Sequence, residues 1–476
     1  MPSGFRHSRQ LSERRLSGHN MRSRTPVADW PADLVTAPRR ASKGGLAQNR
    51  PHPNFAGKLS MAFDRRVFLG SAAGSLATLS VGAYAHGKDP APVVVPKGGF
   101  DTLFLTWQRD PTTTMTIQWV DADLATLPAV SYALAGKDQW TPAPALRKTN
   151  YPMTDLRVYR TELTGLTPGT EYQFKIEGLP EPRRFRTMPA KATNAFHFVS
   201  GGDCGVNDHV VKNNIIAAKQ DPMFTLIGGD LAYDNGRDAN TALAFARNYS
   251  VHMIDTKGRM VPLVTCIGNH EVNGGYNKPR EAAPSYFALH DGLFPEKSYA
   301  TLDFGDYLSL VLLDTGHVAQ IGGEQTDWLD KALADRVGNP NLICVNHAPA
   351  YPSYRPSDGI LGSGFENRKF WVPLFEKHNI DVVLEHHDHT FKRTHPMKDG
   401  HVDKNGIVYL GDGSWGKIRA PLAPEKRPYL VTATENYHLT LHRLEGEQRF
   451  HMAIDENGKV IDVCMTTKKP RGKSVG

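Results

Sequence analysis

Residues 196–233 read FHFVSGGDCGVNDHVVKNNIIAAKQDPMFTLIGGDLAY, and this stretch decides the fold class. Short apolar runs at 196–200 and 224–227 predict β-strands, and residues 207–220 between them have the periodicity of an amphipathic helix. A strand, a helix and a second strand in this order are typical of an α/β domain. Each predicted strand is followed by Gly-Gly-Asp, which places a carboxylate beyond its carboxyl end, where open α/β sheets bind their ligands.

The same alternation extends along most of the remaining chain and predicts an α/β domain at residues 194–468. An apolar run at 261–267 predicts a further strand, again followed by Gly and a polar residue. Helical periodicity recurs at residues 241–255, 324–335 and 366–379. Segments rich in β-forming residues return at 429–467 and are expected to complete the sheets of this domain.

The segment before this domain has the composition of an all-β fold. Residues 92–189 contain short runs rich in Thr, Val, Tyr and Trp, separated by turn residues, at 102–107, 114–120 and 172–177. The sequence LTPGTEY at 166–172 resembles the tyrosine corner of fibronectin type III and immunoglobulin-like sandwiches, in which the tyrosine hydroxyl bonds a backbone group upstream. We therefore expect an N-terminal sandwich in which this tyrosine has a structural role.

The formal net charge of +7 is unevenly distributed along the chain. Residues 1–60 hold 11 Lys and Arg against 3 Asp and Glu, so the chain beyond residue 85 is close to neutral. This distribution argues against binding of nucleic acid by the folded body. The basic segment, rich in Arg, Ser and Pro, is expected to be disordered. Export signals lie at the very N-terminus, so Met61 is a plausible translation start and residues 1–60 a misread extension.

Residues 61–85 have the pattern of a twin-arginine signal peptide. Arg65-Arg66 precedes a weakly apolar stretch at 71–83, and Ala83-Tyr84-Ala85 offers a small-residue cleavage site, so the mature chain is expected to begin near His86. The stretch is too short and too polar to span a bilayer comfortably, although a buried N-terminal helix or an uncleaved anchor is the alternative. We therefore expect an exported protein, periplasmic or extracellular, without stable membrane insertion after cleavage.

The chain has four cysteines, each in or beside an apolar run: Cys204, Cys266, Cys344 and Cys464. None has the CxxC spacing of a redox or metal motif. An exported protein could form disulfides, but this placement favours buried free thiols.

Five short polar clusters follow the ends of predicted strands. They are Gly202-Asp203-Cys204-Gly205, Gly229-Asp230-Leu231-Ala232-Tyr233, Gly268-Asn269-His270-Glu271, Val345-Asn346-His347 and His387-Asp388-His389. Singly each is weak, since a Gly-Asp at a strand end is usually a turn and a lone histidine is usually structural. Together their Asp, Tyr, Asn and His side chains are donors suited to Fe, Mn or Zn. Adjacent glycines let the backbone turn sharply, so that these donors can converge on two metals ~3.5–4 Å apart.

These clusters resemble a known family, the calcineurin-like metallophosphoesterases, and within it the purple acid phosphatases. The family pattern is GDxG, GDxxY, GNHE, VxxH and GHxH in this order, and the resemblance covers nearly all of residues 92–468. The tyrosine of GDxxY is the most discriminating element, because most related phosphoesterases lack it. The resemblance implies a metallophosphoesterase domain of the α/β (α+β) class, with two packed β-sheets flanked by helices, preceded by a fibronectin type III-like sandwich.

The resemblance also implies seven metal ligands. Those of the first metal, typically Fe(III), would be Asp203, Tyr233 and His389. Those of the second metal, typically Fe(II), Zn or Mn, would be Asn269, His347 and His387. A single carboxylate, Asp230, would bridge the two.

The activity implied is hydrolysis of small phosphate monoesters, as in an acid phosphatase. Two cations lower the pKa of a bound water, so that a metal-bound hydroxide can attack phosphorus in line. His270 is not expected to be a ligand. It would instead hydrogen-bond the phosphoryl group or protonate the leaving alcohol, as a general acid does.

The sequence departs from the family pattern in two places. His386 replaces the glycine of GHxH, and we expect it to support the ligands or to be structural. Plant members carry two substrate-contacting histidines soon after VxxH, whereas residues 351–357 here have none. Arg355 in this segment could bind phosphate through its guanidinium fork, the alternative being an ordinary surface arginine.

Two other functions stay open at this point. A phosphodiesterase or nucleotidase could use the same metal centre, because specificity in such enzymes lies in loops such as residues 276–294 and 351–365. A non-catalytic cell-surface binding protein could keep the sandwich and a vestigial metal site. Degenerate members would be expected to lose ligands, and all seven ligand residues are present here.

Overall fold

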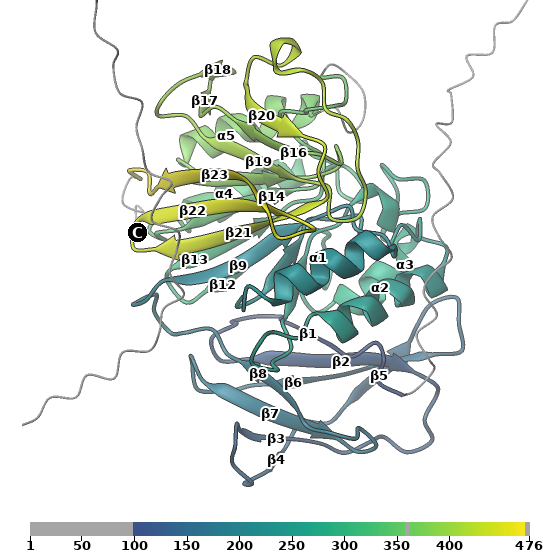
Figure 1. The fold of residues 1–476 in the computed structure, drawn as a ribbon. Helices are drawn as coiled ribbons and strands as arrows, with labels where there is room; N and C mark the ends of the chain where they lie inside the picture. Colours follow the sequence, from purple (N-terminus) through teal and green to yellow (C-terminus); the bar gives the residue numbers. More distant parts are fainter. Residues whose placement is uncertain (1–98, 358–361, 363, 472–476) are drawn as a thin grey trace, which may run out of the picture. The chain divides into compact units, whose positions relative to one another are not determined.

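The computed structural model describes residues 99–357, 362 and 364–471 of the 476-residue chain (Figure 1). The predicted leader, residues 1–60 and 61–85, lies outside the described residues, as do the first residues of the predicted sandwich. Within the described ranges, no helix has the length and apolar character needed to cross a membrane.

The N-terminal part is all-β, as predicted, and consists of two antiparallel four-stranded sheets. The first sheet has the order β1 (Phe104–Thr106), β2 (Met115–Asp121), β6 (Arg157–Leu163) and β5 (Arg147–Asn150). The second has the order β4 (Thr141–Pro142), β3 (Val130–Leu134), β7 (Glu171–Ile176) and β8 (Arg183–Arg186). Large side chains from both sheets, including Trp119, Phe174 and Phe185, are fully buried in the core.

The tyrosine corner is confirmed. The hydroxyl of Tyr172 accepts a hydrogen bond from the backbone N–H of Thr167 at 2.8 Å. The ring stacks on Phe185 with a centroid distance of 5.6 Å. The residue therefore closes the corner before β7 and satisfies a backbone donor there, as in the sandwiches it resembles.

The remaining described chain forms an α/β domain with two large mixed sheets. The six-stranded sheet has the order β11 (Leu263–Thr265), β10 (Thr225–Ile227), β9 (Phe196–Gly201), β21 (His438–Glu445), β22 (Gln448–Asp455) and β23 (Val460–Thr467). The seven-stranded sheet has the order β12 (Ala300–Phe304), β13 (Leu308–Leu312), β14 (Leu342–Asn346), β15 (Val382–Glu385), β19 (Val408–Asp412), β16 (Phe391–Thr394) and β20 (Leu430–Thr434). A small hairpin is formed by β17 (Met397–Lys398) and β18 (His401–Val402).

Side-chain alternation along the seven-stranded sheet assigns its two faces. In β13, Leu310 and Leu312 belong to a core shared with Phe198 of β9 and Leu226 of β10, so one face packs toward the six-stranded sheet. On the other face Val311 packs with residues of the covering helices, among them Leu329, Trp371 and Phe375. The two sheets are therefore packed layers flanked by helices, which confirms the predicted fold class.

The predicted helices form, with one refinement. They are α1 (Asp208–Ala218), α2 (Ala239–His252), α4 (Glu324–Ala334) and, in the predicted 366–379 segment, a π-helical turn η4 (Asn367–Trp371) leading into α5 (Val372–Lys377). Asn207 caps α1 by accepting the N–H groups of His209 and Val210. The short helix α3 (Pro284–His290), which begins with a proline, was not among the predicted helices.

Parallel pairing explains where the polar clusters meet. Strands β9, β10 and β11 are mutually parallel, as are β13, β14, β15 and β19, so the carboxyl ends within each set point the same way. The clusters predicted from sequence follow five of these strands, β9, β10, β11, β14 and β15. Parallel topology therefore collects all five at one edge of the layered sheets.

All four cysteines lie in the described part, and none is paired. Cys204, Cys266 and Cys344 are buried, whereas Cys464 is half-buried. Burial raises the pKa of each thiol, so these cysteines are free and poorly reactive, as expected from their apolar surroundings.

Candidate metal centre

Most of the predicted ligands stand on a backbone conformation that non-glycine residues rarely adopt. Positive φ angles of 54° to 72° occur at Asp203, Asp230, Tyr233, His387 and His389. The left-handed region is unfavourable for residues with a Cβ, so surrounding contacts must hold it. Here it turns five side chains away from their strand ends toward one another.

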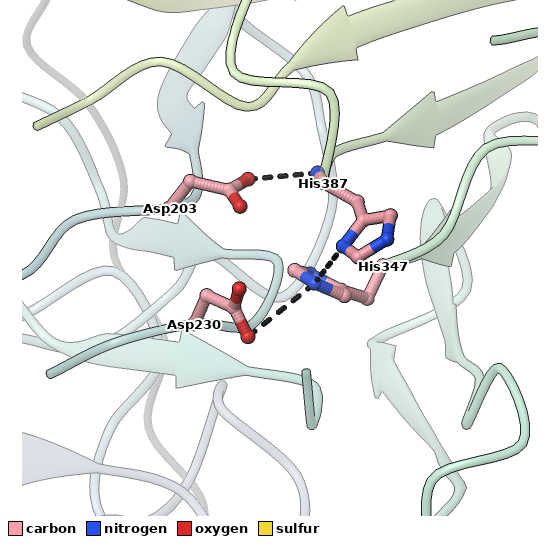
Figure 2. Close-up of side chains that lie close together, drawn as sticks. All are labelled: Asp203, Asp230, His347 and His387. Carbon is pink, nitrogen blue, oxygen red and sulfur yellow. Dashed lines mark hydrogen bonds and ion pairs between the residues drawn. The ribbon is translucent and has the colours of Figure 1, made fainter. Parts of the chain in front are cut away.

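Two aspartates and two histidines form the centre of the cluster (Figure 2). One donor atom from each of Asp203, Asp230, His347 and His387 lies within 4.8 Å of the other three. His347 Nε2 is 3.4 Å from Asp230 Oδ1 and 3.1 Å from His387 Nδ1. The backbone N–H of His387 donates to Asp203 Oδ2 at 2.8 Å, which ties the β15 loop to the β9 loop.

The other three predicted ligands extend this cluster on its two sides. On one side, the Tyr233 hydroxyl lies 2.9 Å from His389 Nε2 and 3.2 Å from Asp203 Oδ1. On the other side, Asn269 Oδ1 lies 3.1 Å from His347 Nε2. The structure thus brings together all seven side chains singled out in the sequence.

The chemistry of these donors suits metal ions. Asp230 Oδ2 is buried without a hydrogen-bond partner among the described residues, which is unfavourable for a carboxylate unless a cation binds it. Burial alone would lower the pKa of His347, but the Asp230 and Asp203 carboxylates outweigh it and raise that pKa to about 9. Buried carboxylates that attract positive charge in this way, together with imidazole nitrogens, form a donor set suited to binding metal ions.

For Tyr233 the same carboxylates disfavour the charged form of the side chain. Burial and the charges of Asp203 and Asp230 raise the pKa of its hydroxyl well above the usual value. Arg355 and Arg419 lower it, but by less. A metal ion beside the phenol would reverse the balance, because a coordinated cation is the largest local charge in such a site.

Glu271 is a supporting residue that the sequence reasoning did not assign. Its carboxylate accepts the backbone N–H groups of Asp230 at 2.8 Å, Leu231 at 2.7 Å and Gly268 at 2.7 Å. The carboxylate therefore clamps the β10 loop to the β11 loop and holds Asp230 in its left-handed conformation. The sequence feature that could have identified Glu271 is its position directly after Asn269 and His270.

Asn235 is a second supporting residue missed in the sequence. Its Oδ1 lies 2.5 Å from His270 Nδ1, so a proton on Nδ1 is donated to the amide oxygen. The backbone N–H of His270 also donates to Asp230 Oδ1 at 2.7 Å, and its ring lies 4.2 Å from the Tyr233 ring. These contacts fix the ring beside the proposed ligands.

His386, which replaces a glycine of the family pattern, fills space left by two other glycines. A Cβ added at Gly228 would lie 1.9 Å from its ring, and one at Gly202 would lie 2.6 Å from it. The His386 ring nitrogen Nδ1 is 2.8 Å from the Asn346 carbonyl, and its backbone N–H donates to the His347 carbonyl. His386 thus packs behind the ligands instead of joining them.

Arg355 lies at this edge and is bound to the ligand-bearing loop. Its guanidinium donates to Asp388 Oδ1 at 3.0 Å and to the His387 carbonyl. Asp388 Oδ2 also accepts the backbone N–H groups of Ser353 and Tyr354, at 2.6 and 2.8 Å. The guanidinium is therefore held beside the centre, with its charge partly offset by one carboxylate.

Comparisons with known proteins agree with this architecture. Residues 101–188 match the family described as "Purple acid Phosphatase, N-terminal domain", and residues 200–391 match "Calcineurin-like phosphoesterase". An uncharacterized protein of Mycobacterium tuberculosis is 27% identical over 76% of this chain and 77% of its own length. Purple acid phosphatase 21 of Arabidopsis thaliana is 25% identical over 72% of this chain and 76% of its own. The structure of a purple acid phosphatase from yellow lupin seeds has a TM-score of 0.63 at 17% identity, over 77% of this chain and 74% of that one, and so shares the fold.

Proposed function

This chain belongs to the purple acid phosphatase family of calcineurin-like phosphoesterases and is a metal-dependent phosphoesterase, and we propose that it hydrolyses phosphate monoesters at a dinuclear centre. The observation that carries the proposal is the convergence of Asp203, Asp230, His347 and His387 within 4.8 Å. These four donors alone could hold one ion, but with Tyr233, Asn269 and His389 the cluster offers seven side chains, enough for a pair of metals.

We assign the seven side chains to two sites that share one carboxylate. Asp203, Tyr233 and His389 would hold Fe(III), because a phenolate is a hard anionic donor. Asn269, His347 and His387 would hold Fe(II), Zn or Mn. Asp230 would bridge, and its Oδ2, which has no hydrogen-bond partner among the described residues, supports that role.

When bound, the two metals would lower the pKa of water and neutralise charge on the phosphoryl oxygens. The other parts of the mechanism depend on side chains of the protein. Asn235 holds the His270 ring through Nδ1, so that Nε2 can hydrogen-bond a phosphoryl oxygen or give a proton to the leaving alcohol. Arg355, fixed by Asp388, adds positive charge beside the centre and is our candidate for phosphate contact.

Tyr233→Phe tests the proposed iron site directly. The variant keeps the ring and its packing but removes the donor oxygen. We expect iron-loaded wild-type protein to show a visible phenolate-to-iron charge-transfer band and the variant to lack it, as recorded by absorption spectroscopy together with iron analysis.

A colourless wild-type protein with full iron occupancy would contradict the tyrosinate assignment. Rates on a panel of phosphate monoesters and diesters test the reaction separately. A clear preference for diesters would replace the monoesterase proposal with a phosphodiesterase on the same centre.

We also propose that the protein is exported through the twin-arginine pathway. The support is Arg65-Arg66 followed by a weakly apolar stretch and by Ala83-Tyr84-Ala85. N-terminal sequencing of the exported protein should find a start near His86. Arg65→Lys together with Arg66→Lys should block export, and continued export of that variant would contradict the proposal.

A further inference from the structure

The rim of the metal centre includes a segment that the proposed reaction does not use. After β19 the chain passes Trp415 and Gly416, whose backbone N–H groups donate to the carbonyls of Gly202 and Asp203 at 3.0 and 3.1 Å. Three residues later, the backbone N–H of Arg419 donates to the His389 carbonyl at 2.8 Å. The segment is therefore fastened to two of the ligand-bearing loops, and it places half-exposed cationic side chains beside them.

Arg419 is held in a defined position at this rim. Its guanidinium carbon lies 5.2 Å from the centroid of the Tyr354 ring, within the range of a cation–π contact. Tyr354 is itself anchored, because its backbone N–H donates to Asp388 Oδ2 at 2.8 Å. Among the described residues, Arg419 has no carboxylate within 4.0 Å, in contrast to Arg355, which pairs with Asp388.

The two arginines are electrostatic neighbours. Burial and the positive charge of Arg355 lower the pKa of Arg419. Both lie at the same edge, because Tyr354, against whose ring Arg419 packs, donates its backbone N–H to Asp388, the carboxylate that pairs with Arg355. Among the described residues, the guanidinium of Arg355 is paired with a carboxylate and that of Arg419 is not, so an anion from solution could bind Arg419.

The transferred phosphoryl group would already be neutralised by the metals and by His270. Arg419 is half-exposed, its backbone N–H bonds the His389 carbonyl, and its guanidinium packs against the Tyr354 ring. We propose that its guanidinium binds a second anionic group, a carboxylate or phosphate carried by the leaving group. The preferred substrates are then phosphate monoesters with an additional negative charge, an inference that rests on the proposed monoesterase function.

A matched pair of substrates isolates this contact: phenyl phosphate and 4-carboxyphenyl phosphate, compared by kcat/KM in the full-length, metal-loaded protein. For each protein, kcat/KM for the carboxylated ester is divided by kcat/KM for phenyl phosphate. Comparing this ratio between Arg419→Gln and wild type removes the intrinsic reactivity of each ester. We expect Arg419→Gln to lower the value for the carboxylated ester by roughly 10- to 100-fold, mainly through KM, and to change the value for phenyl phosphate little. The preference should weaken at high salt.

Two variants serve as controls. Arg419→Lys keeps the charge without the fork and should retain part of the preference. Arg183→Gln removes an exposed arginine from β8 of the sandwich and should leave both esters unaffected. Equal losses on both esters with Arg419→Gln would place Arg419 on the transferred phosphoryl group, and no loss on either would make it a packing residue. Either result would overturn the proposal.

Equilibrium binding separates this inference from the proposed reaction. Phenylphosphonate and 4-carboxyphenylphosphonate bind without turnover, and calorimetry on wild type and Arg419→Gln measures the contribution of the carboxylate alone. A carboxylate preference that depends on Arg419, in a protein that hydrolyses neither ester, would sustain the subsite and contradict the monoesterase function. Hydrolysis of both esters with no binding preference would do the reverse.

Discussion

The sandwich and the metal-binding edge of the α/β domain differ in how their backbones are held. Of the eleven non-glycine residues with positive φ in the described part, only Met153 lies in the sandwich. Six lie at the metal centre: Asp203, Asp230, Tyr233, Asn235, His387 and His389. The sandwich thus follows local backbone preferences, whereas the centre stores unfavourable conformations that serve its chemistry.

The difference shows which contacts do the holding. In the sandwich, strand pairing and buried aromatics suffice. At the centre, buried polar anchors such as Glu271 and Asp388 bond backbone N–H groups of neighbouring loops. Substitutions at the centre are therefore expected to reduce activity more than stability, and substitutions in the sandwich to reduce stability more than activity.

The largest effect on this comparison should come from Asp230→Asn. The amide keeps the shape of the side chain and can still accept the His270 N–H, but it removes the proposed bridging charge. We expect activity to fall to the level of metal-free protein and both metals to be weakened together. In the metal-free protein the same change removes the carboxylate that attracts the buried His347 imidazolium, so thermal stability should fall modestly. Metal analysis and calorimetric melting check this, and loss of only one metal would contradict a bridging role.

His270→Ala is the matched change at a neighbouring residue that we do not place among the ligands. Metal content should stay intact while kcat falls by roughly 10²–10⁴, the range for a lost general acid. Steady-state kinetics with metal analysis of the same sample measures both. If metal is lost, His270 has been assigned the wrong role.

Phe174→Ala should show the opposite behaviour in the sandwich. Phe174 is fully buried in β7, and truncating it should lower the free energy of unfolding by about 3–5 kcal/mol. Below the melting transition, kcat and metal content should match wild type. A fall in kcat while circular dichroism reports a fully folded protein would show that the sandwich shapes the catalytic edge and would break the comparison.

The smallest expected effect is on the stability of the protein in acid and comes from His290 in α3. Its ring lies 5.9 Å from Phe104 of the sandwich, and burial together with the Arg160 charge lowers its pKa to about 3, against a smaller opposing effect of Asp291. An unfolded histidine has a pKa of about 6.5, so between these values only the unfolded chain takes up the proton. Stability is therefore lost as pH falls below about 6.5, by roughly 2 kcal/mol at pH 5.

His290→Gln should remove that part of the pH dependence. Denaturant titrations at pH 7 and pH 5 give, for wild type and variant, the loss of unfolding free energy between the two pH values. Equal losses would show that His290 does not contribute to acid sensitivity where helix α3 and the sandwich meet.

Much of this architecture could be predicted from the order of residue types. Strand and helix periodicities located β9, α1, β10 and α4 to within a few residues, because burial imposes those periods on the sequence. The tyrosine corner was readable because its partner lies only five residues upstream. The single predicted helix at 366–379 was less accurate, since nothing local indicates that it begins with a π-helical turn.

The sequence by itself determined the donor set: seven side chains of suitable chemistry, each placed after a strand whose direction parallel pairing dictates. Only the tertiary structure decided how those donors are supported. Glu271, Asn235 and Asp388 act through backbone groups or side chains up to 41 residues away, and such contacts leave no periodic signal. The same holds for Arg419, whose place beside His389 depends on a loop that follows a different strand. Residue type sets what a side chain can bind, but long-range packing sets where it points.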